Sequence, residues 1–301
     1  MKNLSSVLVF TLSGFSEIRE TWHMLFGITL LCYIVILWFN MTIIVTIILN
    51  RRLHEPMYIF LCNLCINVLY GTAGFYPKFM YDLLSEFQVI SYAGCLTQAF
   101  AIYSSVLCDF STLAIMAYDR YVAICRPLEY HTKMTNYTVM KCILFSWFVP
   151  FFCISTSLVL TTGLTLCGSS IEKLYCEIWA VVKLSTSSTV VNNVFGYMVM
   201  ILYICHTFFI ICSYIRLIGA CQNSAESRSR FMQTCIPHLV VLLNFTVAVL
   251  FDVMYSRYGS RNFPQGLRNF LALEFLIIPP IINPVIYGLK LTKIRKQVLR
   301  F

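Results

Sequence analysis

The triplet Asp119-Arg120-Tyr121 closes a long apolar run and places a carboxylate beside a guanidinium. Such a pair makes a strong charge-assisted hydrogen bond, and the arginine can exchange its partner when the surroundings change. Eleven residues before Arg120, or about three helical turns, Asp109 lies inside the same apolar run. An ionised carboxylate in hydrocarbon costs several kcal/mol unless it is paired or hydrated. These acids suit an electrostatic switch, and they equally fit a helix-end ion pair and a protonated packing residue.

The motifs of common enzyme active sites do not occur in the sequence. It contains no GxGxxG, P-loop, HExxH or GxSxG motif and no pair of CxxC motifs. The histidines are scattered along the chain, at His23, His54, His131, His206 and His238. We therefore expect a protein that is not an enzyme and that has neither a metal site nor a cofactor.

The composition is typical of a membrane protein. Hydrophobic residues make up 59% of the 301 positions and charged residues only 12%, whereas a soluble domain carries about 25% charged residues. A spanning helix needs about 20 mainly apolar residues, and the chain offers seven such runs. The sequence thus predicts one all-α domain over residues 1–301, a seven-transmembrane helix bundle. The spans are expected at about residues 22–49, 56–81, 95–126, 137–160, 190–218, 230–257 and 265–289.

The distribution of charge predicts the orientation of this bundle. If the loop after the first span is cytosolic, that side holds fourteen Lys/Arg and four Asp/Glu, a net +10, while the remainder holds eight and nine, a net −1. Basic residues collect on the cytosolic side of membrane proteins, so residues 1–21 are expected to be extracellular. Asn3 is then a candidate glycosylation site. The total charge of +9 is accordingly a topology signal and no sign of nucleic-acid binding.

Residues 290–301 have the pattern of a short amphipathic helix. Apolar side chains recur at a spacing of three or four residues, at Leu291, Ile294, Val298 and Phe301. Basic side chains fill the positions between them. Such a helix lies on a bilayer with its basic face toward anionic lipid, so we expect it at the inner leaflet.

Four stretches resemble the vertebrate olfactory receptors, a branch of the rhodopsin-like G-protein-coupled receptors. They are LHEPMYIFL from Leu53, MAYDRYVAICRPLEY from Met116, SRFMQTCIPHLVVLLNF from Ser229 and PPIINPVIY from Pro279. The amino-acid sequence of the second span resembles that of fish-type members of the family. The resemblance implies a plasma-membrane receptor that binds a small odorant in the extracellular half of the bundle. It also implies that the receptor activates a stimulatory heterotrimeric G protein, which raises cyclic AMP.

A polytopic transporter or channel is the alternative interpretation of seven spans. Such proteins are marked by internal repeats, by helices broken at matching places or by a charged pore lining. The sequence shows no internal repeat, so the alternative is the weaker of the two.

The resemblance also assigns roles to individual residues. It implies a disulfide between Cys95 and Cys176. Roles in switching and G-protein coupling fall on Asp109, Asp119, Arg120, Tyr121, Tyr214, Asn283, Pro284 and Tyr287. A proline inside a membrane helix frees a backbone carbonyl, which the neighbouring Asn283 is placed to bond.

The chain departs from the family pattern at three positions. Val68 replaces a usual aspartate, which argues against a sodium pocket, and Asn67 beside it points about 100° away around the helix. Thr186 stands where relatives add a further loop cysteine, which leaves Cys167 without an evident partner. Thr246 stands where relatives commonly have tyrosine.

A ligand pocket is expected between the third and sixth spans. Its predicted lining consists of Ile102, Tyr103, Val106, Val249, Val253 and Arg257. Arg257 admits two interpretations. Its guanidinium can hold an anionic, water-soluble odorant through two parallel hydrogen bonds. It can instead extend to lipid headgroups or pair with Asp252 or Glu274.

Overall fold

The structure is a computed structural model that describes residues 9–15, 21–221, 225–259 and 265–290. The side chains of residues 220–221, 225–238, 241, 265, 268 and 287–290 are not part of that description. Three predictions therefore lie outside the described residues. They concern Asn3, the side chain of Tyr287 and the amphipathic helix expected up to Phe301.

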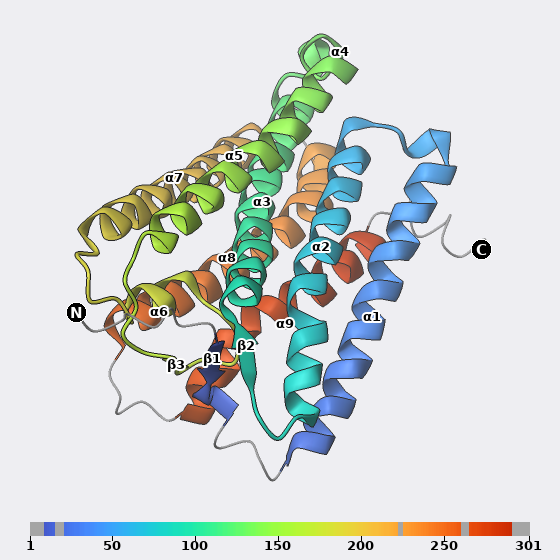
Figure 1. The fold of residues 1–301 in the computed structure, drawn as a ribbon. Helices are drawn as coiled ribbons and strands as arrows, with labels where there is room; N and C mark the ends of the chain where they lie inside the picture. The colour runs from blue at the N-terminus through green and yellow to red at the C-terminus, as the bar shows by residue number, and fades with distance from the viewer. Residues whose placement is uncertain (1–8, 16–20, 222–224, 260–264, 291–301) are drawn as a thin grey trace.

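Seven long helices lie side by side and form the body of the molecule (Figure 1). They are α1 (Trp22–Leu49), α2 (Pro56–Leu84), α3 (Tyr92–Cys125), α5 (Asn136–Thr162), α7 (Val190–Cys221), α8 (Ala225–Tyr258) and α9 (Gln265–Lys290). Six of them contain a stretch long and apolar enough to cross a membrane. The seventh, α8, carries charged residues toward both ends of its sequence. This is the predicted seven-helix bundle.

Short elements connect the long helices. They are η1 (Ser13–Phe15), η3 (Arg51–Leu53), η4 (Pro127–Glu129), α4 (Tyr130–Lys133) and α6 (Ile178–Val182). Several long helices extend past the expected spans, because a helix does not have to stop where the hydrocarbon stops. α2 ends at Leu84 and α3 begins at Tyr92.

The helix α3 is the centre of the bundle. It packs against α2, α5, α7 and α8, and it has buried side chains from Cys95 to Val122. By contrast, α7 turns large apolar side chains outward, including Val194, Met198, Ile201, Phe208 and Ile215. Lipid is as apolar as these side chains, so the exposed face of α7 suits a bilayer.

Local sequence explains where several helices begin. Pro56 occupies the first turn of α2, where its missing N–H costs no hydrogen bond. Ser91 caps α3 by accepting a hydrogen bond from the Gly94 amide at 3.1 Å. Thr135 caps α5 in the same way through the Thr138 amide at 3.3 Å. These boundaries follow from residues next to each other in the chain.

The prolines of α9 are accommodated by a neighbouring helix. Pro284 has no N–H and cannot donate to the carbonyl of Pro280, four residues earlier. Asn40 of α1 donates to that carbonyl at 3.2 Å and to the Ile36 carbonyl at 2.8 Å. We expected Asn283 to meet such a freed carbonyl. The partner is instead Asn40, because α1 lies against α9.

A small sheet at one end of the bundle was not predicted. β1 (Val9–Leu12) pairs antiparallel with β2 (Val89–Ser91) and parallel with β3 (Ser170–Ile171). Strands of two to four residues are too short to show a period in sequence. The sheet joins the N-terminal segment, the loop before α3 and the loop after α5.

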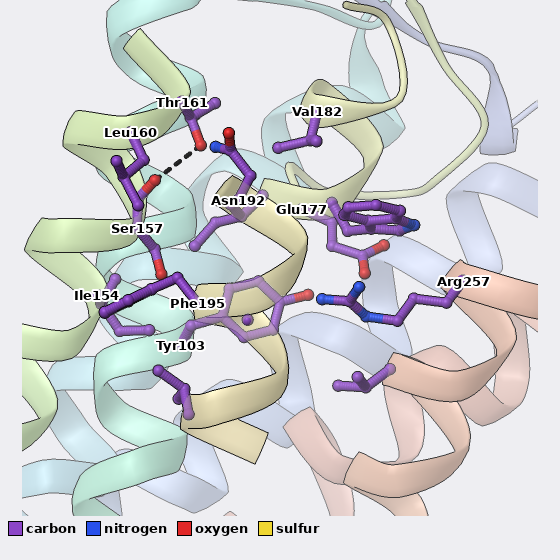
Figure 2. A pocket seen from close by; sticks show the side chains of 15 residues that line it. Tyr103, Ile154, Ser157, Leu160, Thr161, Glu177, Val182, Asn192, Phe195 and Arg257 are labelled. Carbon is purple, nitrogen blue, oxygen red and sulfur yellow. Dashed lines mark hydrogen bonds between the residues drawn. The ribbon is translucent and has the colours of Figure 1, made fainter. Parts of the chain in front are cut away.

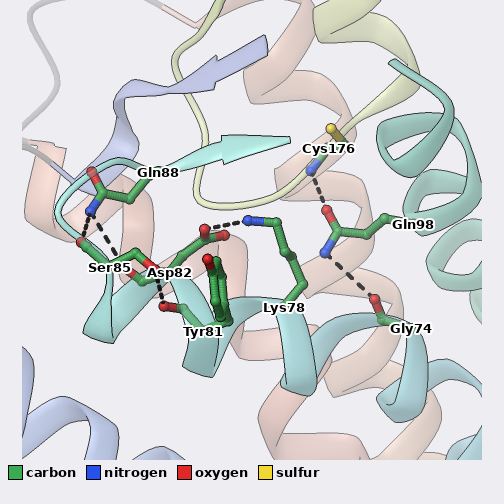
Figure 3. Close-up of polar contacts among 8 residues, drawn as sticks. All are labelled: Gly74, Lys78, Tyr81, Asp82, Ser85, Gln88, Gln98 and Cys176. Carbon is green, nitrogen blue, oxygen red and sulfur yellow. Dashed lines mark hydrogen bonds and ion pairs between the residues drawn. The ribbon is translucent and has the colours of Figure 1, made fainter. Parts of the chain in front are cut away.

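The loop after α5 is tied to α3 by a disulfide. Cys95 and Cys176 form this bond, as the resemblance implies, with their Cα atoms 5.2 Å apart. Gln98, one turn along α3, accepts a hydrogen bond from the Cys176 amide at 3.0 Å and donates to the Gly74 carbonyl at 3.5 Å (Figure 3). Cys167 is exposed and forms no disulfide with any described cysteine.

Replacing Cys95 or Cys176 with serine is expected to destabilise the protein by about 2 to 5 kcal/mol, as loss of a native disulfide does. Thermal unfolding of the purified protein and antibody staining of intact cells measure the loss. Cys167→Ser is the matched control and should leave both readouts close to wild type. Peptide mapping that joined Cys95 to Cys167 would contradict the assigned pair.

Candidate functional site

Two joined chambers lie among α3, α5, α7 and α8. The inner chamber has a volume of about 330 Å³ and an almost wholly apolar lining, and the outer chamber, of about 130 Å³, lies against α6 (Figure 2). The residues that line both are Tyr103, Ile154, Gly196, Val199, Val253 and Arg257. A pocket of this size and polarity suits a small apolar ligand with one polar group.

Most of the predicted pocket residues meet at these chambers. Tyr103, Val106, Val249, Val253 and Arg257 line the inner chamber. Ile102 does not line it and is buried elsewhere in the core. On a helix, Ile102 and Tyr103 point about 100° apart, so α3 can direct only one of them into the chamber.

Arg257 projects from α8 to the junction of the two chambers. Its guanidinium lies between two aromatic rings, 4.3 Å from the centre of Trp179 and 4.8 Å from that of Tyr197. It donates a hydrogen bond to Asn193 Oδ1 at 3.0 Å. The Nε–H group is buried and has no acceptor among the described residues. The guanidinium is thus held in place, and its buried Nε–H remains available to a ligand.

Arg257 pairs with neither of the acids considered for it. Asp252 pairs with Lys173 at 2.6 Å, and Glu274 accepts a hydrogen bond from Asn244 at 2.9 Å. No described carboxylate lies within ion-pair distance of Arg257. The positive charge of Arg257 is stabilised by the two aromatic rings and the Asn193 amide oxygen, without a carboxylate.

A buried ion triad adjoins the outer chamber, which Glu177 lines. Lys173 lies 2.6 Å from Asp252 of α8 and 3.2 Å from Glu177. Ser256 donates to Glu177, and Tyr175 donates to Asp252 at 3.0 Å. Burial alone would lower the pKa of Lys173, but the two carboxylates offset it and the pKa is raised. Burial raises the pKa of Glu177 against the pull of Lys173.

A polar contact lies deeper in the bundle, between α2 and α3. Asn67 donates to Asp109 Oδ1 at 2.7 Å and to the Ser105 carbonyl at 2.8 Å. Val68, next to Asn67, is buried and contributes no polar group. Asp109 is therefore hydrogen-bonded rather than ion-paired, which suits a carboxyl surrounded by hydrocarbon.

At the other end of α3, Asp119 holds Arg120. Arg120 Nε donates to Asp119 at 2.9 Å, and the Tyr130 hydroxyl of α4 donates to the second oxygen of Asp119 at 2.9 Å. Asp119 is fully buried, whereas 20% of the Arg120 side chain is exposed. The neighbouring Tyr121 side chain is half-buried. The pair is held, yet the arginine remains accessible from outside the bundle.

The remaining predicted switch residues lie on two other helices of the bundle. Tyr214 is fully buried on α7. Asn283 is buried on α9, and its Oδ1 has no hydrogen-bond partner in the described part of the chain. Pro284 follows it inside the same helix. These residues belong to separate helices that pack around the bundle core.

Comparison with known proteins decides the family. A family model described as "Olfactory receptor" matches residues 29–301. The chain belongs to the olfactory receptor family. It is 32% identical to Olfactory receptor 13D1 of Homo sapiens, over 99% of this chain and 86% of that protein. It is 33% identical to Olfactory receptor 1D2 of Pongo pygmaeus, over 96% of this chain and 92% of that protein.

The fold of this olfactory receptor is also that of a solved receptor. The crystal structure of squid rhodopsin superposes with a TM-score of 0.77 at 17% identity, covering 94% of this chain and 80% of that chain. This likeness bears on the fold alone. Family membership establishes a multi-pass membrane receptor that is not an enzyme, and the transporter or channel alternative is thereby set aside.

Several residues at the receptor's chambers were missed in the sequence. Lys173, Glu177 and Trp179 lie in the loop after α5, and Asn193 and Tyr197 lie on α7. One of the loop residues could have been predicted from the sequence. Glu177 follows Cys176 directly, so a disulfide to α3 must bring that carboxylate against the bundle. Asn193 and Tyr197 carry no such signal, because their apposition to Arg257 depends on how α7 packs beside α8.

Lys173→Ala is expected to destabilise the receptor by about 3 to 5 kcal/mol, because it leaves two buried carboxylates without their shared cation. Thermal unfolding in detergent measures the change. Lys133→Ala is the matched control, since Lys133 pairs with Glu129 at 2.6 Å on the surface, where an ion pair contributes about 0 to 1 kcal/mol. Equal effects of the two substitutions would contradict the buried triad.

Proposed function

We propose that this olfactory receptor binds a small, water-soluble, anionic odorant in the two chambers and then activates a stimulatory heterotrimeric G protein, which raises cyclic AMP. In this proposal it lies in the plasma membrane with residues 1–21 extracellular. The observation that carries the ligand class is Arg257. Its partly buried guanidinium faces both chambers with no carboxylate partner among the described residues.

Electrostatics favours an anion at this place. The other buried charges near the chambers, those of Lys173, Glu177 and Asp252, are already engaged with one another. Arg257 has no ion pair with a described carboxylate, and its Nε–H lacks an acceptor among the described residues. A carboxylate or sulfate accepts two parallel hydrogen bonds from a guanidinium, and a bond to a charged group contributes about 1.5 to 3 kcal/mol.

The apolar inner chamber supports a ligand with a hydrocarbon part. Val106, Val249 and Val253 line it beside Arg257. An acidic head at the guanidinium then places the apolar tail toward the inner end. Such a molecule is soluble in water through its head and gains free energy from burial of its tail, at about 25 cal/mol per Å².

At the cytoplasmic side we assign coupling to Arg120. In the described state its guanidinium is held by Asp119, which Tyr130 also bonds. Odorant binding shifts the receptor toward a state in which α8 has moved outward and Arg120 has left Asp119 to face the G protein. The ligand acts through its higher affinity for that second state.

The Asn67–Asp109 contact is the proposed internal part of the switch. Asp109 lies on the same helix as Arg120 and next to Phe110, which lines the inner chamber. A change in the inner chamber at Phe110 is thereby passed to Asp109 through the backbone of α3. Asn283 and Pro284 of α9, and Tyr214 of α7, are proposed to adjust as those helices shift.

Arg257→Ala is expected to weaken an acidic agonist by about tenfold or more, because loss of one charged hydrogen bond removes at least the 1.4 kcal/mol that a decade in potency requires. Cyclic AMP responses of cells to a panel of acids and neutral analogues provide the measurement. Gly196→Ala is a companion variant. A Cβ at Gly196 would stand 2.6 Å from the Arg257 guanidinium, so it should displace the anchor without removing its charge.

Surface expression measured on the same cells serves as the control for both variants. Arg257→Lys keeps the positive charge but loses the planar fork, so it should retain part of the acid's potency. A screen that yields neutral agonists alone, or an unchanged acid potency in Arg257→Ala at normal expression, would remove the anionic ligand from the proposal.

Arg120→Ala is expected to abolish the cyclic AMP response while surface expression remains measurable, because the opened state loses the cation offered to the G protein. Arg126→Ala is the matched control. Arg126 lies six residues along the chain and makes an exposed pair with Glu129 at 3.5 Å, so its loss should leave most of the response. A normal response of the Arg120 variant would refute the assigned role.

A further inference from the structure

The inner end of the inner chamber holds hydroxyl groups without partners. Thr246 of α8 and Tyr203 of α7 both line the chamber. Their hydroxyl oxygens are buried and have no hydrogen bond within the described part of the receptor. Ser111 lies near the Tyr203 hydroxyl without forming a hydrogen bond of acceptable geometry with it, and the Ser111 hydroxyl donates to the Leu107 carbonyl at 3.0 Å.

These hydroxyls lie at one level of the bundle. The ring of Phe110 lies 6.1 Å from Tyr203 and 4.8 Å from Phe245, the residue before Thr246. Phe110 also lines the inner chamber. Phe110, Tyr203 and Thr246 therefore make up one surface, which we call the chamber floor.

The face of α8 that lines the chambers is polar at both ends and apolar between them. Thr246, Val249, Val253 and Arg257 follow at spacings of three, four and four residues, which places them on one face of a helix. Eleven residues separate the two polar ends, about 16 Å along the helix axis. Helical side chains lean toward the helix N-terminus, so the guanidinium reaches inward and shortens that distance.

Each polar end of the pocket has buried groups without a hydrogen-bond partner among the described residues. Arg257 Nε–H can only donate, while the hydroxyls of Tyr203 and Thr246 both donate and accept. A buried polar group without a hydrogen bond is unfavourable, and two such groups at the floor lower the affinity of a purely apolar tail. A ligand with a polar atom at each end would satisfy both ends of the pocket.

We propose that the ligand of this receptor is a bipolar amphiphile, with an oxyanion at one end and a hydroxyl or carbonyl group at the other, and that Thr246 and Tyr203 bind the second group. This deepens the proposed function and rests on it for the position of the oxyanion at Arg257. The ligand lies along α8 with its apolar middle against Val249 and Val253.

The identity of residue 246 supports the assignment of a floor site. A threonine side chain is short, so it takes up little of the space at the floor, and it keeps a hydroxyl that can bond to a ligand.

The test compares three ligand series of increasing chain length in the cyclic AMP assay: unsubstituted carboxylic acids, the matching ω-hydroxy acids, and the methyl esters of both. A hydroxyl added to an alkyl tail normally weakens binding in an apolar pocket. Here the ω-hydroxy acid is expected to be at least fivefold more potent than the plain acid over a narrow range of lengths, of about eight to twelve carbons from the span above.

Thr246→Val and Tyr203→Phe should each reduce this preference, measured as the ratio of the potencies of the two acids on the same variant. The plain acid should gain potency or keep it, because each substitution removes a buried hydroxyl that the apolar tail leaves unpaired. Thr207→Val is the matched control, because Thr207 lines the same chamber but already donates to the Tyr203 carbonyl at 3.2 Å. It should keep the preference. Surface expression is measured for every variant.

The outcomes separate this inference from the proposed function. If ω-hydroxy acids are never more potent than plain acids, or if their advantage survives in both floor variants, the bipolar ligand is wrong even when acids activate through Arg257. If esters with an ω-hydroxyl are favoured in a Thr246-dependent way while acids gain nothing over esters, the floor site stands and the anionic anchor fails. A receptor that responds to no member of any series contradicts both.

Discussion

Hydrocarbon offers no hydrogen bonds, and this constraint determines where the polar side chains of the bundle lie. Each buried amide or acid must find its partner on another helix or within its own turn. Asn40 bonds the carbonyl that Pro284 leaves free in α9. Asn67 bonds Asp109, and Asn63 accepts a hydrogen bond from Trp147 at 2.8 Å. These contacts set the mutual positions of the helices more sharply than apolar packing, which has no direction, can do.

The same constraint explains why the loop after α5 matters to the ligand chambers. Its cysteine is bonded to α3 and its lysine to Asp252 of α8. The loop thus joins two of the helices that line the chambers, and Glu177 lines the outer chamber from it. A charged triad is tolerated there because each carboxylate faces the shared cation and a hydroxyl donor. The volume available to an odorant is therefore set by a loop as well as by helices.

The central helix carries both halves of the receptor's activity. Tyr103, Val106 and Phe110 face the chambers, Asp109 faces α2, and Asp119 holds Arg120 at the far end. A shift of α3 at the chamber floor changes the positions of all these residues. A packed core moves between discrete arrangements and does not deform continuously. In the proposed mechanism, ligand recognition and coupling share this one element.

The fold class and the family could be predicted from the sequence, and the resemblance to that family implied the disulfide pair. Length, apolar runs and the motifs around Arg120 and Pro284 are local features, and local features can be read without coordinates. Five of the six predicted pocket residues also line the inner chamber, because helical periodicity identifies a face once the neighbouring helices are known from the resemblance. Ile102 was misplaced, because the rotation of α3 by one residue position cannot be deduced from its apolar pattern alone.

The contacts between groups on different helices became known from the packing of the helices. The tertiary structure placed Asn193, Trp179 and Tyr197 around Arg257, in place of either acid considered for it. It assigned Asp252 to Lys173, and the carbonyl freed in α9 to Asn40. It also added a sheet of three short strands. Each of these depends on contacts between residues far apart in the chain, whose partners are chosen by packing and by burial rather than by spacing.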